Sequence, residues 1–354
     1  MSLNNTAIKN LISWSKREFS HLPWRENRSL YRTLVSEIML QQTTVSTVLN
    51  HFERFIKIFP DIDTLANSSE EKLTIEWKGL GYYRRARNLH KACRYFQENF
   101  QSKIPLDFNE LVKAPGIGEY TANAILAMGA NENTLCVDAN LERVLSRLNF
   151  IRMQKGPKLI KKINSDFREN LIANEINNFG GRDYNEAMMD LGRVYCQARK
   201  ADCLICPMST SCLAFKNTDP LTIPEPVDKK TKKYFDLKLL RLIVLKNNKI
   251  LSYKKSNEQW LSGQFELPSF VIESEDEDLS QYPRLAKFLD YDLLPMIKTS
   301  ITKYRISNFV LICSEDEFEE ITNCKLDQYQ YIENDTNANL TTASTKSLAI
   351  ILQS

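Results

Sequence analysis

Four cysteines form the most compact set of reactive side chains in the sequence. Cys196, Cys203, Cys206 and Cys212 have the spacing C-x6-C-x2-C-x5-C. Because intracellular proteins seldom keep structural disulfides, this spacing predicts a metal site rather than a disulfide framework. Four thiolates in one asymmetric loop favour an iron–sulfur cluster, whereas structural zinc sites usually combine two short C-x2-C pairs. Zinc remains the alternative.

Two glycines mark a second compact motif. The segment Pro115-Gly116-Ile117-Gly118 separates two helical patterns and predicts a hairpin between two helices. Glycine allows the backbone to approach a partner closely, and amides at the start of the second helix could bind a phosphate oxygen. An ordinary corner between two helices would have the same pattern. The motif by itself does not separate these two interpretations.

Two carboxylates suit acid–base chemistry. Glu37 lies among Val35, Ile38 and Met39 in an apolar helical pattern, so we expect it to be buried. Burial raises the pKa of a carboxyl group, and a raised pKa suits a general acid. The alternative places Glu37 on the solvated face of its helix. Asp138 begins another helical pattern and is by default its N-cap.

The elements that must position these residues are almost entirely helical over residues 1–215. A spacing of apolar residues near 3.6 predicts continuous helix over Tyr31–Phe59, and Gly79-Leu80-Gly81 predicts a break before a basic helix at about 82–100. The arginines of that basic helix, Arg84, Arg85 and Arg87, could contact phosphates or could equally be solvated. Further helices are expected at about 107–114, 119–130, 139–149, 157–172 and 183–195.

The second part of the chain has a different character. Residues 216–236 contain three prolines and a lysine-rich run, which is typical of a linker. Residues 237–246, 249–254 and 299–313 predict strands, with a turn at Asn247-Asn248. We therefore expect an all-α domain over 1–215 and an α+β domain over 237–354.

Composition supports this division. The 354 residues are enough for about two domains. With 43% hydrophobic and 26% charged residues, the chain can bury a core and is not a disordered protein. No apolar run approaches the roughly 20 residues of a membrane span, and no secretory signal is visible, so we expect a cytoplasmic protein. Residues 1–220 hold 30 Lys and Arg against 24 Asp and Glu, a mild excess that is compatible with nucleic acid but weak support for it.

The order of these motifs resembles a known superfamily. The hairpin followed by the four-cysteine loop is similar to the endonuclease III superfamily of helix–hairpin–helix DNA glycosylases, and within it to the MutY-type adenine DNA glycosylases. The similarity extends over about residues 7–215, and Gln259–Pro268 resembles a segment of the Nudix-like domain that this family carries at its C-terminus. The matching stretches of the first domain are Leu22–Arg25, Ser36–Thr43, Gly79–Leu89, Val137–Asn140 and Asn185–Gly192.

The resemblance implies a function and a set of roles. It implies a monomeric enzyme with a 4Fe–4S cluster on the four cysteines, which flips adenine opposite 8-oxoguanine or guanine out of double-stranded DNA and excises it in base excision repair. Glu37 would be the general acid and Asp138 would stabilise the cationic sugar, as in other glycoside chemistry. The other implied positions are Tyr120 and Asn140 in the same pocket, Arg25 and Glu186 near the purine, Gln42 and Tyr82 as wedges in the duplex, Gly116 and Gly118 at the DNA, and Thr302 at the lesion.

Tyr120 discriminates within the superfamily, because it stands where strand-cleaving members place a lysine for Schiff-base chemistry, and it implies a monofunctional glycosylase. Two departures qualify the resemblance. Ala139 replaces the usual glycine after the catalytic aspartate and resembles the mismatch thymine glycosylases. In place of a Phe-Ser-His-like loop that reads 8-oxoguanine, the chain has Ile301-Thr302-Lys303, where Thr302 keeps a hydroxyl and Lys303 adds a mobile charge.

Two alternative functions therefore stay open. One is a thymine or uracil mismatch glycosylase on the same scaffold, which Ala139 favours. The other is a catalytically silent DNA-binding protein that scans for damage, although the presence of both Glu37 and Asp138 speaks against it. No Nudix box follows Pro268, so we do not expect nucleotide hydrolysis by the C-terminal domain.

Overall fold

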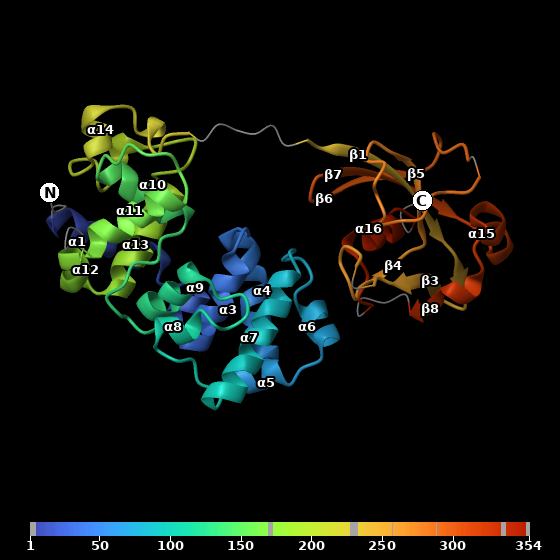
Figure 1. Cartoon of the computed structure of the whole chain (residues 1–354), viewed down its shortest axis with the longest axis horizontal. Coiled ribbons are helices and arrows are strands. Elements are labelled where there is room, and N and C mark those ends of the chain that lie inside the picture. The colour runs from blue at the N-terminus through green and yellow to red at the C-terminus, as the bar shows by residue number, and fades with distance from the viewer. Residues whose placement is uncertain are drawn as a thin grey trace. The chain divides into compact units, whose positions relative to one another are not determined.

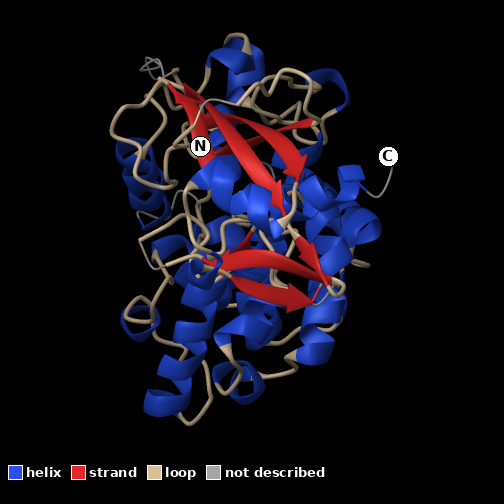
Figure 2. Cartoon of the chain, turned by 90° about the vertical axis from the view of Figure 1, so that its right-hand side faces the viewer, coloured by secondary structure: helices blue, strands red, loops and turns tan. Residues whose placement is uncertain are grey.

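Two structural units follow each other along the chain, residues 1–228 and 229–354 (Figure 1). The computed structural model describes residues 5–168, 173–226, 233–256, 258–287, 289–333 and 338–351. The first unit is helical in its described residues, and all strands of the described chain belong to the second unit (strands in red in Figure 2). None of the helices in the described ranges is long and apolar enough to cross a membrane.

The helices of the first unit follow the expected periodicity in most places. The described elements are α1 (Asn5–Phe19), α2 (Pro23–Glu26), α3 (Leu30–Leu40), α4 (Val45–Ile58), α5 (Ile62–Ala66), α6 (Glu70–Glu76), α7 (Arg84–Phe100), α8 (Phe108–Leu111), α9 (Glu119–Ala124), a π-helical turn η1 (Ile125–Gly129), α10 (Ala139–Leu148), α11 (Pro157–Arg168), α12 (Ala173–Phe179), α13 (Gly181–Val194), the 3-10 turn η2 (Cys203–Ile205), α14 (Leu213–Asn217) and the 3-10 turn η3 (Pro220–Thr222). The predicted helix at 157–172 ends at Arg168, and residues 169–172 lie outside the described ranges.

The prediction of one continuous helix over Tyr31–Phe59 is wrong. The chain leaves α3 after Leu40, passes through a left-handed residue at Gln42 (φ +56°) and begins α4 at Val45. The hydroxyl of Thr44 accepts a hydrogen bond from the amide of Thr47 and so caps the second helix. The apolar spacing continues in phase across this turn, which is why periodicity alone does not reveal it.

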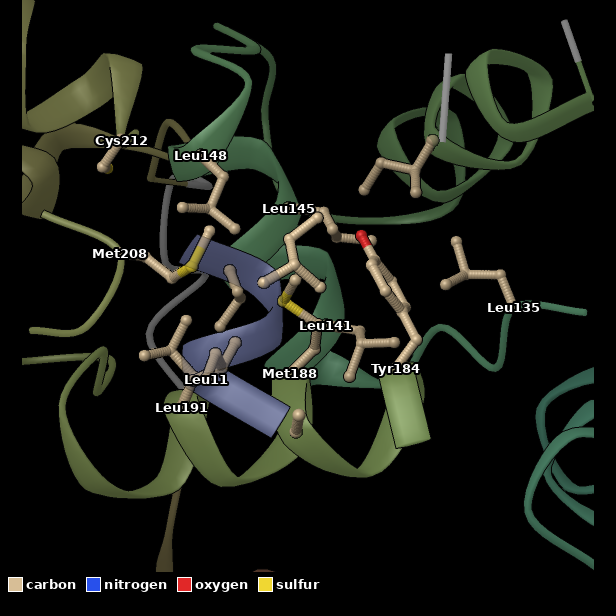
Figure 3. Packing of buried hydrophobic residues seen from close by; sticks show 14 of the residues in the cluster. Leu11, Leu135, Leu141, Leu145, Leu148, Tyr184, Met188, Leu191, Met208 and Cys212 are labelled. Atoms are coloured by element: carbon tan, nitrogen blue, oxygen red, sulfur yellow. The ribbon is translucent and has the colours of Figure 1, made fainter. Parts of the chain in front are cut away.

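A core of apolar side chains holds α1, α10 and α13 together (Figure 3). Leu141 and Leu145 of α10 pack with Met188 of α13, and Leu11 of α1 belongs to the same cluster. All four side chains are buried. This packing fixes α10 and α13, and these two helices carry Asp138 at one N-terminus and Glu186 on the other helix.

The first unit extends further than the sequence predicted. Ile223 is buried in the same core, and its carbonyl accepts a hydrogen bond of 2.7 Å from Nε of Arg147. The linker therefore does not begin at residue 216, because the backbone up to this point packs on the helical unit. Residues 227–232 of the expected linker lie outside the described ranges, and the first strand begins at Phe235.

The second unit contains two sheets with helices. Its elements are β1 (Phe235–Ile243), β2 (Leu245–Lys246), β3 (Lys249–Lys254), β4 (Phe265–Glu266), β5 (Ser269–Ser274), β6 (Met296–Ile301), β7 (Tyr304–Ile312), α15 (Glu315–Thr322), the 3-10 turn η4 (Leu326–Gln328), β8 (Gln330–Glu333) and α16 (Thr342–Ile351). One sheet has the order β5-β1-β7-β6, with β1 and β7 parallel, and the other has the order β2-β3-β4 with β8 on β3. The expected strand over 299–313 is a hairpin of β6 and β7 that turns at Thr302 (φ +50°).

Candidate active site

A cavity of about 760 Å³ in the first unit brings together most of the predicted site residues. They come from α2, α3, the turn after α3, the glycine hairpin, α9, the start of α10 and α13. Tyr82 is not among the lining residues and is 62% exposed, and Thr302 belongs to the second unit. The predicted residues that line this cavity are Arg25, Glu37, Gln42, Gly116, Gly118, Tyr120, Asp138, Asn140 and Glu186.

Glu37 is buried in the wall of this cavity, as its apolar neighbours predict. The hydroxyl of Tyr120 donates a hydrogen bond of 2.6 Å to Oε2 of Glu37. Burial raises the pKa of Glu37 to about 7, the bond from Tyr120 lowers it, and the negative charges of Asp138 and Glu186 raise it. Glu37 is therefore partly protonated near neutral pH, which a carboxyl group in water is not.

Asp138 is the N-cap of α10, and hydrogen bonds to both oxygens hold its carboxylate in one orientation. Oδ1 accepts hydrogen bonds from the amides of Asn140 (2.8 Å) and Leu141 (2.7 Å), and Oδ2 accepts one from Nδ2 of Asn140 (2.9 Å). Burial raises the pKa of Asp138, and the bonds from these two amides oppose the rise because they stabilise the charged form. The cap and a chemical role are compatible, since the residue lines the cavity while it holds the helix.

An ion-pair network forms one side of the cavity, and part of it was missed by the sequence analysis. Arg28 donates two hydrogen bonds to Glu186, of 2.6 and 3.0 Å. Arg25 lies 2.8 Å from Asp190 through Nη1 and 3.4 Å from Glu186 through Nε. Burial lowers the pKa of Arg25, but Glu186 and Asp190 outweigh it, and the net pKa is raised.

The sequence contained one signal for the two residues that were missed, Arg28 and Asp190. Glu186 and Asp190 are four positions apart on α13, so both carboxylates lie on the same face of the helix. Two carboxylates on one face of a helix, among buried apolar neighbours, predict that positively charged side chains pair with them, because an unpaired buried charge is unfavourable. That these cations are Arg25 and Arg28, more than 150 residues away along the chain, depends on packing.

The backbone of the glycine hairpin lies too close to a neighbouring side chain to leave room for a Cβ at Gly116. Gly116 has a φ of +81°, and a Cβ there would lie 2.5 Å from Cβ of Asn88, so only glycine fits. A Cβ at Gly118 would meet nothing within 4 Å, and this residue lines the cavity. The helix after the hairpin is interrupted by the π-helical turn at Ile125–Gly129, which differs from the continuous helix expected over 119–130.

The four spaced cysteines line one small cavity of the first unit. Sγ of Cys196 accepts a hydrogen bond of 3.3 Å from Nη1 of Arg147, and its carbonyl accepts one of 2.7 Å from Nε of Arg143. Nη2 of Arg143 also donates to Oδ1 of Asn140 at 2.9 Å, so one guanidinium connects the cysteine loop with the residue that orients Asp138. In the described ranges, no group of three or more His, Cys, Asp or Glu residues is placed to hold a metal ion.

Comparison with known proteins places the chain in a family. Residues 35–169 match the model of the HhH-GPD superfamily base excision DNA repair proteins. The chain is 34% identical over 250 residues to the adenine DNA glycosylase of Buchnera aphidicola subsp. Schizaphis graminum, which covers 71% of this chain and 70% of that protein. The chain belongs to the adenine DNA glycosylase family. The adenine DNA glycosylase of Buchnera aphidicola subsp. Baizongia pistaciae is 35% identical over 260 residues, covering 72% of this chain and 70% of that protein.

A solved structure agrees at the level of the fold. A thermostable thymine-DNA glycosylase superposes with a TM-score of 0.51 at 23% sequence identity, over 60% of this chain and 95% of that chain. The first unit of this chain and this neighbour thus share the helical fold. The helical first unit and the second unit with its two sheets form the architecture of this family member.

Proposed function

We propose that this protein is a monofunctional DNA glycosylase that excises adenine opposite 8-oxoguanine or guanine in base excision repair, and that it acts on double-stranded DNA as a monomer. The observation that carries the proposal is the pair of carboxyl groups in one cavity: Glu37 with a pKa near 7, and Asp138 held by two amides. Breaking an N-glycosidic bond needs a proton for the leaving base and a negative charge for the cationic sugar. These two residues supply one of each.

The proposed reaction begins with extrusion of the adenine nucleotide from the duplex into the cavity, because a stacked base is out of reach. Protonated Glu37 donates its proton to the purine ring, which turns adenine into a neutral leaving group. The bond from C1′ to the base breaks, its electron pair leaves with adenine, and the sugar that now carries positive charge faces the carboxylate of Asp138. A water molecule then adds to C1′ and loses a proton, so that the products are free adenine and an abasic site. Asn140 keeps the Asp138 carboxylate in place through its bond of 2.9 Å.

Recognition is assigned to the other residues around the cavity. Arg25 and Glu186 line it and would contact the purine, and Arg28, which also lines the cavity, holds the Glu186 carboxylate through two hydrogen bonds. The exposed side chains of Gln42 and Tyr82 would fill the space that the extruded base leaves in the stack. The glycine hairpin at 115–118 would approach the DNA backbone.

The four cysteines are proposed to hold a 4Fe–4S cluster. The four cysteines line one cavity, Nη1 of Arg147 donates a hydrogen bond to Sγ of Cys196, and Nε of Arg143 donates one to the carbonyl of Cys196, so the loop is attached to α10. Zinc bound by the same four cysteines is the alternative occupant. The cluster would tie the loop 196–212 to α10 and so support the N-terminus that carries Asp138.

The second unit is proposed to be a Nudix-like domain that reads the lesion through Thr302. Lys303 is not the mobile charge that the sequence suggested. Its Nζ lies 3.0 Å from Oδ2 of Asp276 and 4.3 Å from the ring centroid of Phe235, so ion pairing and a cation–π contact hold it. Thr302 lies in the turn between β6 and β7, and its side chain is exposed, so its hydroxyl is accessible to a modified purine.

Ala139 favours a second candidate, a thymine or uracil mismatch glycosylase. It lies at the first position of α10 and lines the cavity beside Asp138. An excision assay on duplexes with A:8-oxoguanine, A:G, T:G and U:G pairs decides between the two. We expect release of adenine and no strand cleavage. Excision of thymine or uracil alone would contradict the proposal, and a borohydride-trapped covalent complex with DNA would contradict its monofunctional character.

A further inference from the structure

Two exposed residues beside the site have strained backbone. Gln42 lies in the turn between α3 and α4, and Tyr82 lies just before α7. Both have left-handed backbone, with φ of +56° and +46°. Residues with a side chain seldom adopt this conformation, and it persists only where surrounding contacts hold it in place. The structure therefore needs a group that holds both turns.

Arg85 binds the chain on both sides of the first of these residues. Its Nη1 donates to the carbonyl of Gln41, and its Nη2 donates to Oγ1 of Thr43 at 2.9 Å. Nη1 also donates to the carbonyls of Ile38 (2.9 Å) and Met39 (2.8 Å) in the last turn of α3. Such carbonyls have no partner within their helix, and a cation at this end also complements the helix dipole.

The same guanidinium binds the turn that carries Tyr82. Nη2 donates to the carbonyl of Leu80 at 2.7 Å and to that of Gly81 at 3.3 Å, and the backbone amide of Arg85 donates to the carbonyl of Tyr82 at 2.8 Å. The guanidinium carbon lies 5.6 Å from the centroid of the Tyr82 ring. Arg85 is only 9% exposed, so it has neither of the two roles that the sequence left open for it, a phosphate contact or a solvated side chain.

We propose that Arg85 is a positioning residue that sets Gln42 and Tyr82 relative to each other, so that the two side chains enter a DNA duplex together. This inference rests on the proposed function, in which these residues fill the stack beside the extruded nucleotide. Arginine suits this task because its planar fork serves six oxygen acceptors on two segments. Lysine has three donors on a single nitrogen and cannot replace the two nitrogens that serve these six acceptors, so part of the two segments would lose its partner.

The test is Arg85→Lys in the full chain. Two quantities are measured: the single-turnover rate of adenine excision from an A:8-oxoguanine duplex, and the fluorescence of 2-aminopurine placed next to the adenine, which rises when the base unstacks. We expect the excision rate to fall by roughly 10- to 100-fold, because small misplacements of a positioned group cost this much. The fluorescence rise on binding should shrink, while circular dichroism shows a folded protein.

Arg94→Lys is the matched control. Arg94 also lies on α7, and its Nε donates to a backbone carbonyl, that of Ala66 in α5, at 3.0 Å. The substitution is the same, but the segment that Arg94 holds contains neither Gln42 nor Tyr82. Excision should stay within about twofold of wild type, as for sites that do not share partners.

A double-mutant cycle separates positioning from a general loss of structure. In a protein that already carries Gln42→Ala and Tyr82→Ala, Arg85→Lys should change excision by less than about twofold, because the residues through which it acts are gone. An equal loss in both backgrounds overturns the proposal, as does wild-type excision by folded Arg85→Lys protein. If that variant does not fold, Thr43→Val, which removes one acceptor beside Gln42, replaces it in the same cycle. A wild-type protein that unstacks 2-aminopurine without excising adenine contradicts the proposed function. In that case the fluorescence of the wild type and of Arg85→Lys is compared, and an unchanged fluorescence rise overturns the positioning role of Arg85.

Discussion

The hydroxyl of Tyr120 lies 2.6 Å from Oε2 of Glu37 and donates a hydrogen bond to it. This contact links α9, directly after the glycine hairpin, to the middle of α3, and it joins two residues that are 83 positions apart. It opposes the effect of burial, which is the largest influence on the Glu37 carboxyl. Tyr120 thus keeps the pKa of Glu37 from rising further and leaves it near 7.

We expect excision to depend on pH through Glu37. The general acid must carry its proton, so the rate should be highest below pH 7 and fall about tenfold per pH unit above it. At the acid end, protonation of Asp138 should lower the rate, and because burial raises the pKa of Asp138 this limb lies above the usual range of an aspartate. Single-turnover rates from pH 4 to 9 check this. A rate that rises steadily to pH 9 would contradict a protonated Glu37.

Tyr120→Phe should move the alkaline limb of that profile to higher pH. The substitution removes the hydroxyl that stabilises the Glu37 carboxylate, so the pKa of Glu37 rises above its value in the wild type. The excision rate at pH 8, as a fraction of the maximum rate of the same protein, should therefore be larger than in the wild type. Free adenine should still be released. An unshifted limb would show that the hydrogen bond does not control the acid.

Glu37→Gln should abolish excision and leave duplex binding largely intact, because an amide cannot donate the proton while contacts to phosphates remain. The same change affects stability. The pKa of Glu37 is raised in the folded protein, so its stabilising contribution is present below about 4.5 and is lost as the pH rises through about 7. At pH 8 the variant should be more stable than the wild type by up to roughly 3 kcal/mol, and at pH 4.5 the gain should vanish. Urea unfolding at the two pH values measures this difference.

The purified protein should be brown and contain about four irons per chain if the cysteine loop holds the proposed cluster. Cys203→Ser should lower the iron content and destabilise the first unit, whereas Cys93→Ser, at a buried cysteine outside the loop, should keep the iron. Iron analysis and the visible absorption spectrum provide the measurement. Stoichiometric zinc without visible absorbance would exclude the cluster.

The turn between β6 and β7 should discriminate 8-oxoguanine from guanine only weakly. Ile301 offers no aromatic ring, and Lys303 is engaged by Asp276 and Phe235 rather than free. Ile301→Phe combined with Lys303→His should raise the preference for A:8-oxoguanine over A:G by about tenfold, the value of one stacking contact or hydrogen bond. Affinities for the two duplexes, before and after the change, test this. An unchanged preference would place the recognition of the lesion on other residues.

Motif spacing and periodicity were sufficient to predict a helical first domain, a second domain with strands, the burial of Glu37 and Asp138 as an N-cap. Tyr120 and the chemical role of Asp138 came from the resemblance to a known family instead. The inferences from spacing and periodicity succeed because helix periodicity, caps and hairpin glycines are local properties of the chain. The N-cap role of Asp138, for example, follows from its position before an apolar helical run, and the structure has the expected bonds.

Contacts between distant segments were decided only by the tertiary structure. The break between α3 and α4 is invisible to periodicity because the turn keeps the apolar residues in phase, and it is held in part by Arg85 from another helix. The pairing of Arg28 with Glu186 and the extension of the first unit to Ile223 depend likewise on how helices pack. A side chain's partner across 50 or 150 residues is set by the free energy of burying the whole core, and no window of sequence contains that quantity.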